Sequence, residues 1–243
     1  MNCYIDMNTA ETILKYAECR SGFFLSELSE YLRDKETISD AGILWHIKRL
    51  IKDNKLSRIA RGQYGVSAKK EFIPTLTDNV RTIFDIVHNE FPLIDICVYS
   101  GSDISAFQHH ISSNKATYIE VTKDATEAVF HWLADQGLKA YHRPSEELMT
   151  EYVNLSDECI IVKPLVSESP IIKVDGVPMP KLEKILVDIN KDSDFYYLQG
   201  GEIFYIMEQA QSLYNINESK MLRYASRRGM RQKMIDLLNY KEP

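Results

Sequence analysis

The stretch from residue 38 to residue 66 restricts the possible folds of this chain more than any other. Its first part, "ISDAGILWHIKRLIKDNKL", has apolar residues that recur at the spacing of one helix face. These residues are Ile43, Ile47, Leu50 and Ile51. Two short apolar-polar runs follow and flank Arg61-Gly62, where the glycine supplies the positive φ that a tight hairpin usually requires. The pattern predicts a helix with one buried face, followed directly by a β-hairpin.

The residues before this stretch complete a familiar order of elements. Asn8 is placed to cap a first helix, with Glu11 three residues on as the returning side chain of a capping box. Residues 23–25 suit a very short strand, and Ser26 and Ser39 are N-caps for a second and a third helix. Helix, short strand, helix, helix and hairpin is the order of a winged helix-turn-helix.

The charges of the chain are unevenly distributed. The net charge is -6, but residues 1–70 carry +3, residues 71–218 carry -14 and residues 219–243 carry +5. Residues 45–70 hold eight basic side chains and one acidic one. A basic N-terminal part joined to an acidic body suggests two domains with different partners. We therefore place a winged helix-turn-helix domain at 1–70 and a second domain at 71–243.

The basic residues of the first domain lie on the side of the third helix that the core does not use. In a winged helix-turn-helix this helix enters the major groove, and the hairpin reaches the flanking backbone or the minor groove. Lysine and arginine there suit phosphates, whereas serine, tryptophan and histidine suit base edges or methyl groups. Asp40 fits either a helix N-terminal charge or an acceptor for cytosine. The alternative is an ordinary solvated basic face. The predicted DNA-binding residues are Ser39, Asp40, Trp45, His46, Lys48, Arg49, Lys52, Arg58 and Arg61.

The second domain reads as a mixed α/β fold. After the linker "SAKKEFIPTLTD", amphipathic helical segments alternate with strands such as "LIDICVYS", "ATYIEVT" and "DECIIVKPLV". Asp175-Gly176 is a hairpin signal. The helical segment "KLEKILVDINKD" follows, and later helices near 202–214 and 218–238 form a helical C-terminal end. Within these segments, Glu183 is expected to pair with a lysine or arginine, a candidate being the basic run "RYASRRG".

No pattern of catalytic residues emerges from this domain. Gly101-Ser102 is similar to the opening of a nucleotidyltransferase motif, but no pair of aspartates follows it at a useful distance. Asp192 and Asp194 form such a pair far downstream, in a polar loop. His109 and His110 are adjacent, so on a helix they diverge by about 100° and do not readily share one metal. The sequence predicts no catalytic residue, no metal and no cofactor, and therefore a protein that is not an enzyme.

The chain has no run of about 18 apolar residues, which a membrane helix needs, and no signal peptide pattern at its N-terminus. Its four cysteines, at positions 3, 19, 97 and 159, are far apart and form no pair of the CxxC kind. These features predict a cytoplasmic protein with reduced thiols and no membrane partner.

Four segments, in this order, resemble the AbiEi family, which is the antitoxin half of the AbiE abortive-infection, type IV toxin–antitoxin systems. They are "LSRIARGQYGV", "ECIIVKPLVSESPI", "VPMPKLEKILVDI" and "LRYASRRG", and the likeness spans most of the chain. It implies a winged-helix repressor of its own operon that binds double-stranded promoter DNA. It also implies a C-terminal domain that antagonises a nucleotidyltransferase-like toxin, without a need for a stable complex.

The resemblance places the DNA contacts on the third helix and the wing, at positions among those already named. It carries over no catalytic residue to the C-terminal domain. The antitoxin-function candidates there are Lys181, Glu183, Lys184, Arg223, Arg227 and Arg228. Since a single winged helix with few basic contacts binds weakly, two copies are expected on an inverted repeat. Two alternatives stay open: a nucleotidyltransferase-like enzyme with a DNA-binding appendage, and a winged-helix transcription factor that senses a small ligand.

Overall fold

The computed structural model describes residues 3–33, 38–53, 55–67, 69–105, 107–108, 114–198 and 200–239, with side chains from residue 9 onward. The chain divides into two compact units, Met1–Lys70 and Glu71–Pro243. His109 and His110 lie outside the described residues. Within the described residues, no helix has both the length and the apolar character that a membrane span requires.

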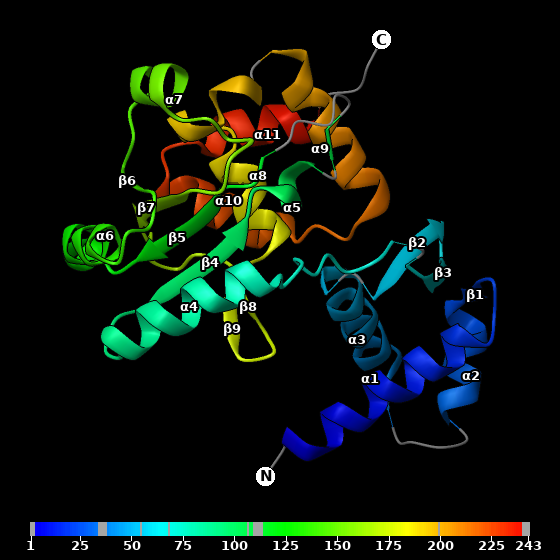
Figure 1. Ribbon diagram of the computed structural model, residues 1–243. Coiled ribbons are helices and arrows are strands. Elements are labelled where there is room, and N and C mark those ends of the chain that lie inside the picture. The colour runs from blue at the N-terminus through cyan, green and yellow to red at the C-terminus, as the bar shows by residue number, and fades with distance from the viewer. Residues whose placement is uncertain are drawn as a thin grey trace. The chain divides into compact units, whose positions relative to one another are not determined.

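The smaller unit contains three helices and a three-stranded sheet among its described residues (Figure 1). The elements are α1 (Cys3–Glu18), β1 (Phe23–Phe24), α2 (Leu25–Arg33), α3 (Asp40–Lys52), β2 (Leu56–Ala60) and β3 (Gln63–Val66). Strand β3 pairs antiparallel with both β1 and β2, so the hairpin β2–β3 is extended by the short strand. This is the order of elements that the sequence predicts.

Two of the predicted helix starts in this unit are wrong. Helix α1 begins at Cys3, so Asn8 lies inside it and is not its cap. Helix α2 begins at Leu25, one residue before Ser26. There the carboxylate of Glu27 accepts a hydrogen bond from the backbone N–H of Phe24 at 2.8 Å, which satisfies a donor at the helix start. The predicted cap of α3 is confirmed, since the Ser39 hydroxyl accepts from the N–H of Gly42 at 3.2 Å.

The larger unit is a mixed α/β structure with a helical C-terminal end, as predicted. Its elements up to the main sheet are α4 (Asp78–Glu90), β4 (Ile96–Ser100), α5 (Ser102–Ser105), β5 (Thr117–Val121), the 3₁₀ turn η1 (Lys123–Ala125), α6 (Thr126–Asp135), β6 (Ala140–His142), α7 (Glu146–Tyr152) and β7 (Ile160–Pro164). Then come β8 (Ile171–Val174), β9 (Val177–Pro180), α8 (Leu182–Asp188), the 3₁₀ segment η2 (Ser193–Leu198), α9 (Gly201–Leu213), α10 (Glu218–Arg227) and α11 (Arg231–Asn239).

The main sheet has the strand order β4-β5-β7-β6. Strands β5, β7 and β6 are parallel, and β4 joins the edge antiparallel to β5. The carboxyl ends of the three parallel strands therefore meet at one edge of the sheet. In open α/β sheets, the crevice outside these ends is where ligands commonly bind.

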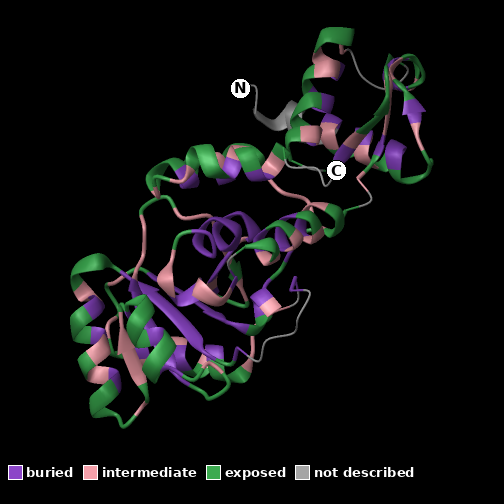
Figure 2. Cartoon of the chain, turned by 90° about the horizontal axis from the view of Figure 1, so that it is seen from above, coloured by how far each residue is buried: buried purple, intermediate pink, exposed green. Residues whose placement is uncertain are grey.

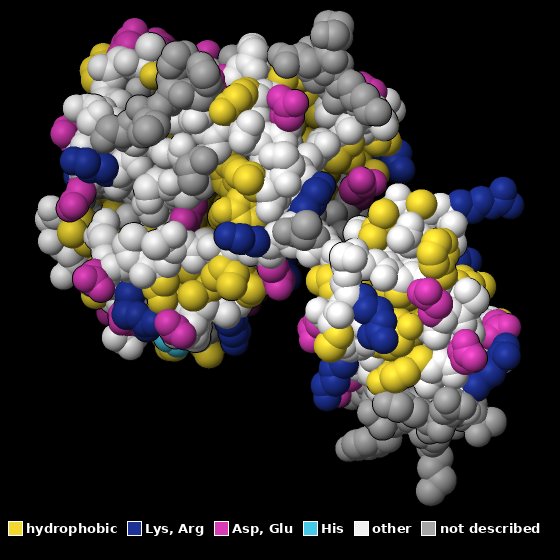
Figure 3. All heavy atoms as spheres, turned by 90° about the vertical axis from the view of Figure 1, so that its right-hand side faces the viewer, with side chains coloured by type: hydrophobic (Ala, Val, Ile, Leu, Met, Phe, Trp, Pro, Cys, Tyr) yellow, Lys and Arg dark blue, Asp and Glu magenta, His cyan; other side chains and the backbone are white. Residues whose placement is uncertain are grey.

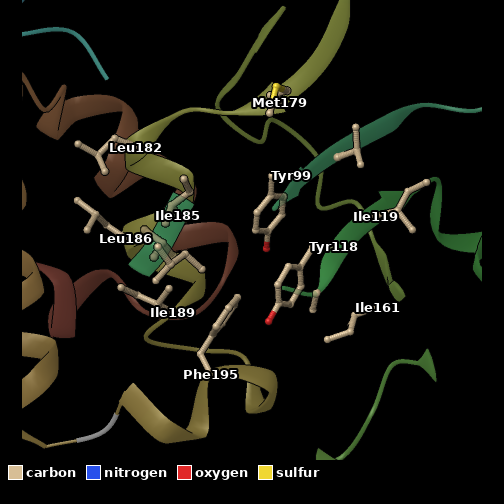
Figure 4. Packing of buried hydrophobic residues seen from close by; sticks show 14 of the residues in the cluster. Tyr99, Tyr118, Ile119, Ile161, Met179, Leu182, Ile185, Leu186, Ile189 and Phe195 are labelled. Carbon is tan, nitrogen blue, oxygen red and sulfur yellow. The ribbon is translucent and has the colours of Figure 1, made fainter. Parts of the chain in front are cut away.

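Helices cover both faces of this sheet. On one face, the Asn79 amide of α4 donates to the Thr117 hydroxyl at 3.0 Å, and His142 of β6 lies 3.1 Å from the Thr126 hydroxyl of α6. On the other face, Phe195 of η2 stacks on Tyr118, with ring centroids 5.2 Å apart. Figure 4 shows Tyr99 and Tyr118 on this face with α8 side chains packed beside them. Because both faces are covered, strands β4 and β5 are buried along their length and β7 is buried up to its last residue, whereas the edge strand β6 is half-buried (Figure 2).

One turn of the larger unit agrees with its sequence signal, and another divides a predicted helix in two. The predicted hairpin at Asp175-Gly176 is confirmed, with φ of 47° and 86° at the two turn residues of β8–β9. The helix predicted at 218–238 is instead two helices, α10 and α11, which are separated at Gly229, where φ is 68°. A glycine in this left-handed conformation ends a helix, because it avoids the clash that a Cβ atom would introduce.

Gly101, between β4 and α5, lies against a buried amide. A Cβ atom at this position would come within 2.1 Å of the Asn114 side-chain oxygen. Asn114 is held in place, since its amide nitrogen donates to the hydroxyls of Tyr118 at 3.0 Å and Tyr197 at 2.8 Å. The glycine is therefore required by close packing at this turn.

We expect Gly101→Ala to lower the free energy of unfolding by about 1–3 kcal/mol, because the added methyl group overpacks a site that is already full. Urea unfolding curves measure this difference. Gly201→Ala is the matched control, since a Cβ atom there meets no other atom within 4 Å and its φ is not in the left-handed region. Equal stability of the two variants would contradict the packing argument.

Candidate functional site

The outer face of α3 carries an aromatic ring and three cations in a row. Trp45, Lys48, Arg49 and Lys52 are all exposed, and their spacing of three, four and seven residues places them on one helix face. Trp45 is 50% exposed, a large fraction for a tryptophan. The Arg49 guanidinium lies 5.4 Å from its ring centroid, within the range of a cation–π contact. This contact limits the positions that the guanidinium can take.

The β2–β3 hairpin adds two more exposed cations. Arg58 lies on β2, and its Nε donates to the backbone oxygen of Ala60 at 3.3 Å. Arg61 lies at the tip, next to Gly62, whose φ is 75°. On the side of the smaller unit seen in Figure 3, lysine and arginine side chains lie among exposed hydrophobic side chains and a few acidic ones. The exposed residues of α3 and the hairpin, Trp45, Lys48, Arg49, Lys52, Arg58 and Arg61, form what we call the α3–hairpin surface.

His46 does not belong to this surface, and the prediction that it contacts base edges is wrong. It is only 3% exposed and packs edge-to-face with Trp45, with ring centroids 4.9 Å apart. Since it follows Ile43 by three residues and precedes Leu50 by four, it falls on the core face of α3. The sequence pattern misassigned His46 because this position lies at the boundary of the apolar stripe, where a histidine suits either the core face or the solvent face of the helix.

Ser39 and Asp40 occupy the N-terminus of α3 and have partners within the unit. The Ser39 hydroxyl caps the helix, as described above. Asp40 forms an ion pair with Arg33 of α2, with Nη2 at 3.2 Å from Oδ1 and 3.3 Å from Oδ2. Both side chains are well exposed, so the pair contributes little to stability. Of the two roles that the sequence allows for Asp40, this geometry favours the helix N-terminal charge.

In the larger unit, a lysine is completely buried between two carboxylates. Lys184 of α8 is 1% exposed, and its Nζ lies 2.6 Å from Glu120 Oε1 and 2.5 Å from Asp188 Oδ2. The other oxygen of Asp188 accepts a hydrogen bond from the Tyr224 hydroxyl of α10 at 2.8 Å. Glu120 comes from β5, so this contact joins the face of the sheet to two C-terminal helices.

The ion pairs continue toward the surface in alternating sign. Arg228, the residue after α10, has its Nε 3.3 Å from Asp188 Oδ1 and also pairs with Asp192. Lys163 of β7 then bridges two carboxylates, with Nζ 2.8 Å from Asp192 Oδ2 and 2.8 Å from Asp194 Oδ2. We call this set the buried charge network; it consists of Glu120, Lys163, Lys184, Asp188, Asp192, Asp194, Tyr224 and Arg228.

The pKa shifts of the network follow from burial and pairing. Burial alone lowers the pKa of Lys184, but Asp188 and Glu120 outweigh it and raise this pKa well above its usual value. Burial raises the pKa of Asp194 and of Glu120. Lys163 and Arg228 overcome the same effect at Asp192 and lower its pKa. Among the described residues, no group of three or more His, Cys, Asp and Glu side chains is arranged to hold a metal ion.

The six antitoxin-function candidates do not form one site. Lys184 and Arg228 belong to the buried charge network. Glu183 is buried, and its carboxylate accepts from the backbone N–H of Asn217 at 2.8 Å, so the prediction that it pairs with a lysine or arginine is wrong. Lys181 lies 3.7 Å from Glu71, and Arg227 pairs with Glu168. Arg223 is exposed on α10.

Sequence reasoning overlooked Glu120 and Lys163, which occupy the centre of the sheet. Each is a single charge inside a β-branched run, in "ATYIEVT" and "CIIVKPLV". Since charged residues are almost never fully buried without a partner, two charges in buried strands indicate that an ion pair exists. The strand register confirms that these two charges are close to each other, because Glu120 lies opposite Lys163 in the parallel β5–β7 pair.

The two parts of the nucleotidyltransferase pattern do not meet. Gly101 lies beside the start of β5, where its N–H donates to the oxygen of Ala116 at 2.9 Å. Asp192 and Asp194 bind Lys163, near the opposite end of the same strands. Both aspartates are thus occupied by a lysine at a distance from the Gly101-Ser102 turn.

A cavity of about 340 Å³ opens beside the buried charge network. It lies at the carboxyl ends of the parallel strands, next to the loops that follow β6 and α8. Its lining consists of Glu120, Arg143, Pro144, Lys163, Pro164, Asp188, Lys191, Asp192, Ser193, Asp194, Tyr224 and Arg228. Four cations and four carboxylates therefore face one small space.

Residues 42–242 match the family described as a family of unknown function (DUF6577). The match covers most of the chain, so the chain belongs to this family. No curated protein is similar to it in sequence.

Replacing Lys184 by methionine should lower the free energy of unfolding by about 3–5 kcal/mol, because it leaves two buried carboxylates without their cation. Chemical denaturation measures the loss. Lys181→Met, three residues earlier, is the control. Its ion pair with Glu71 is largely solvated and is expected to contribute about 0–1 kcal/mol. If both variants lose the same stability, the network has no special role.

Asp103 supplies a pH-dependent test of the larger unit. It is 5% exposed, one oxygen accepts from the N–H of Thr75 at 2.9 Å, and the other has no hydrogen-bond partner among the described residues. Burial raises its pKa to about 6. A carboxylate with a raised folded-state pKa destabilises the fold above that pKa, and the penalty disappears as pH falls toward its unfolded value near 4.

We expect Asp103→Asn to be more stable than the parent at pH 8, by up to about 3 kcal/mol, since it lacks the charge. The difference should shrink as pH is lowered from 6 to 4. Urea unfolding at a series of pH values measures it, with the exposed Asp85→Asn as control. A difference that does not change with pH would rule out titration of Asp103 as the cause.

Proposed function

We propose that this protein is a DNA-binding transcriptional autorepressor and the antitoxin of a type IV toxin–antitoxin system. The observation that carries the DNA-binding part is the α3–hairpin surface. Its aromatic ring and cations project from one helix face and one adjoining hairpin, opposite the side chains that build the core. We infer a winged helix-turn-helix for this unit, with α3 in the major groove and the hairpin as the wing.

Each part of the surface suits a different part of DNA. Lysine and arginine neutralise phosphates, and binding of this kind weakens as the salt concentration rises. Trp45 offers an apolar face for a thymine methyl group at the level of the base edges. The cation–π contact between Arg49 and Trp45 favours a particular position of the guanidinium, which reduces the entropy lost on binding.

The surface also supports a two-fold arrangement on DNA. It contains five cations: Lys48, Arg49, Lys52, Arg58 and Arg61. A single copy with so few phosphate contacts binds weakly at physiological salt. Two copies on an inverted repeat would double the contacts, and we propose this as the operator architecture.

The antitoxin part of the proposal is supported by the resemblance to the AbiEi family. In the larger unit, the segments that carry it supply Lys163, Lys184 and Arg228 to the buried charge network. The likeness thus falls on residues that stabilise the unit, which is consistent with a shared fold. We propose a nucleotidyltransferase-like toxin as the target, antagonised in the cytoplasm without a need for a stable complex.

A second candidate function is a DNA-binding regulator that senses a small ligand. The charged cavity beside the buried charge network favours it, because pockets at the carboxyl ends of parallel strands commonly bind ligands. The two candidates share the α3–hairpin surface and differ only in the role of the larger unit.

Binding to the protein's own promoter should fall by at least tenfold in Arg49→Ala/Arg61→Ala, because about two phosphate contacts are lost. The slope of log affinity against log salt should decrease by about two. Fluorescence anisotropy at a series of salt concentrations measures both. Lys15→Ala, an exposed cation on α1, is the control and should bind as the parent does. DNA binding that survives the double substitution with no salt dependence would falsify the assignment.

Expression of the gene next to this one should arrest growth if it encodes the toxin, and co-expression of this chain should restore growth. Arg49→Ala/Arg61→Ala in the same assay separates the two activities, since rescue from a heterologous promoter does not require operator binding. If growth is unaffected in every combination, the antitoxin part of the proposal is wrong, while the DNA-binding result stands by itself.

A further inference from the structure

The cavity beside the buried charge network has a floor and a rim of different character. The floor consists of carboxylates that are already paired with lysine or arginine, among them Asp192 and Asp194 with Lys163. The rim carries Arg143 and Lys191, which are both exposed. The floor thus pairs four carboxylates with three cations, whereas the rim carries two cations.

Arg143 is held at the rim by its backbone. It follows β6 directly and has a φ of 45°, a left-handed conformation that residues other than glycine rarely adopt. Its N–H donates to the oxygen of Val162 on β7 at 3.0 Å, which fixes the residue against the end of the sheet. Unfavourable backbone conformations of this kind persist where the surroundings impose them, and they cluster at ligand sites.

Lys191 reaches the same rim from the loop after α8. Its N–H donates to the oxygen of Asp188 at 2.9 Å. The two loops are joined, since the Ser193 hydroxyl donates to the backbone oxygen of Pro144 at 3.0 Å. Arg143 and Lys191 therefore lie within two residues of a hydrogen bond that connects their loops.

These two cations have no ion-pair partner in the part of the chain that the structure describes. Neither side chain forms an ion pair or a hydrogen bond with a described residue, whereas Lys163 and Arg228 each pair with two carboxylates. Two positive charges that form no ion pair, on adjoining loops, suit a compact group with about two negative charges. A phosphate monoester carries about -1.5 to -2 at pH 7.

The carboxylates of the floor determine which other chemical groups of the ligand fit beside its anionic group. Each ionised carboxylate can accept several hydrogen bonds, so Glu120, Asp192 and Asp194 keep acceptor capacity beyond their pairs with lysine and arginine. Hydroxyl groups are donors that fit such acceptors, whereas a second anionic group on the ligand would meet repulsion there. The volume of about 340 Å³ limits the ligand to a small molecule.

We propose that this cavity binds a small phosphate monoester that carries hydroxyl groups, such as a sugar phosphate or a nucleoside monophosphate. Arg143 and Lys191 hold the phosphate, and the carboxylates of the floor accept hydrogen bonds from the hydroxyls. The site belongs to the larger unit alone and goes beyond the proposed DNA binding, so it is tested without DNA.

Isothermal titration calorimetry of the full chain at low salt tests the site with four probes: ribose 5-phosphate, adenosine 5′-monophosphate, inorganic phosphate and succinate. We expect at least one of the two phosphate esters to bind at least tenfold more tightly than inorganic phosphate and than succinate. The ester that binds more tightly identifies the source of the phosphate. Failure of both esters to bind at millimolar concentrations, or binding of succinate as tight as that of the better ester, would overturn the proposal.

Variants separate a specific site from general attraction to a cation. Arg143→Asn removes the guanidinium but keeps a residue that tolerates the left-handed backbone, and Lys191→Gln removes the ammonium. Each should weaken the better ester by about tenfold, as expected for the loss of a charge-assisted hydrogen bond. Lys220→Gln, an exposed cation on α10 outside the cavity, should bind as the parent does. Equal affinity of Arg143→Asn/Lys191→Gln and the parent contradicts the assignment, whatever the outcome of the DNA assays.

Discussion

The ion pairs of Lys184 with Glu120 and Asp188 are the interaction on which the architecture of the larger unit depends. They join β5 to α8, and Asp188 extends the contact to α10 through the Tyr224 hydroxyl. Burying these charges is unfavourable unless each has a partner, so we infer that they favour the arrangement of the two helices on the sheet in which all of them are paired. The network thereby stabilises the way in which the helical C-terminal end covers the sheet.

The buried charge network changes the interpretation of the basic segments of the C-terminal half. Arg228 of "RYASRRG" pairs with Asp188 and Asp192, and Lys184 of "KLEKILVD" is wholly enclosed. Lys184 and Arg228 are therefore structural, whereas Arg223 and Arg227 of the same basic segments are exposed. The cations without an ion-pair partner among the described residues of the cavity are Arg143 and Lys191, and neither stands out in the sequence, since each is a single basic residue in a polar loop.

Local patterns predicted most of the elements. The helical spacing of Ile43, Ile47 and Leu50, the Ser39 cap and the Asp175-Gly176 turn all correspond to the structure, because each depends on neighbours within a few residues. The start of α1 was misplaced, since an N-cap residue at Asn8 does not prevent the helix from extending to Cys3. His46 was wrongly assigned to the outer face of α3 for a related reason, since tertiary packing decides whether a residue at the edge of an apolar stripe is buried.

The sequence by itself determined the mixed α/β class, most of the order of the helices and strands, and the run of cations on α3 and the hairpin, because these follow from periodicity, caps and turns along the chain. Only the tertiary structure decided the partners of the buried charges and the position of the cavity. Lys163 meets Asp192 and Asp194 across about thirty residues, and Lys184 meets Glu120 across 64. Such pairings depend on strand order and on which face each helix covers, and no local pattern encodes either.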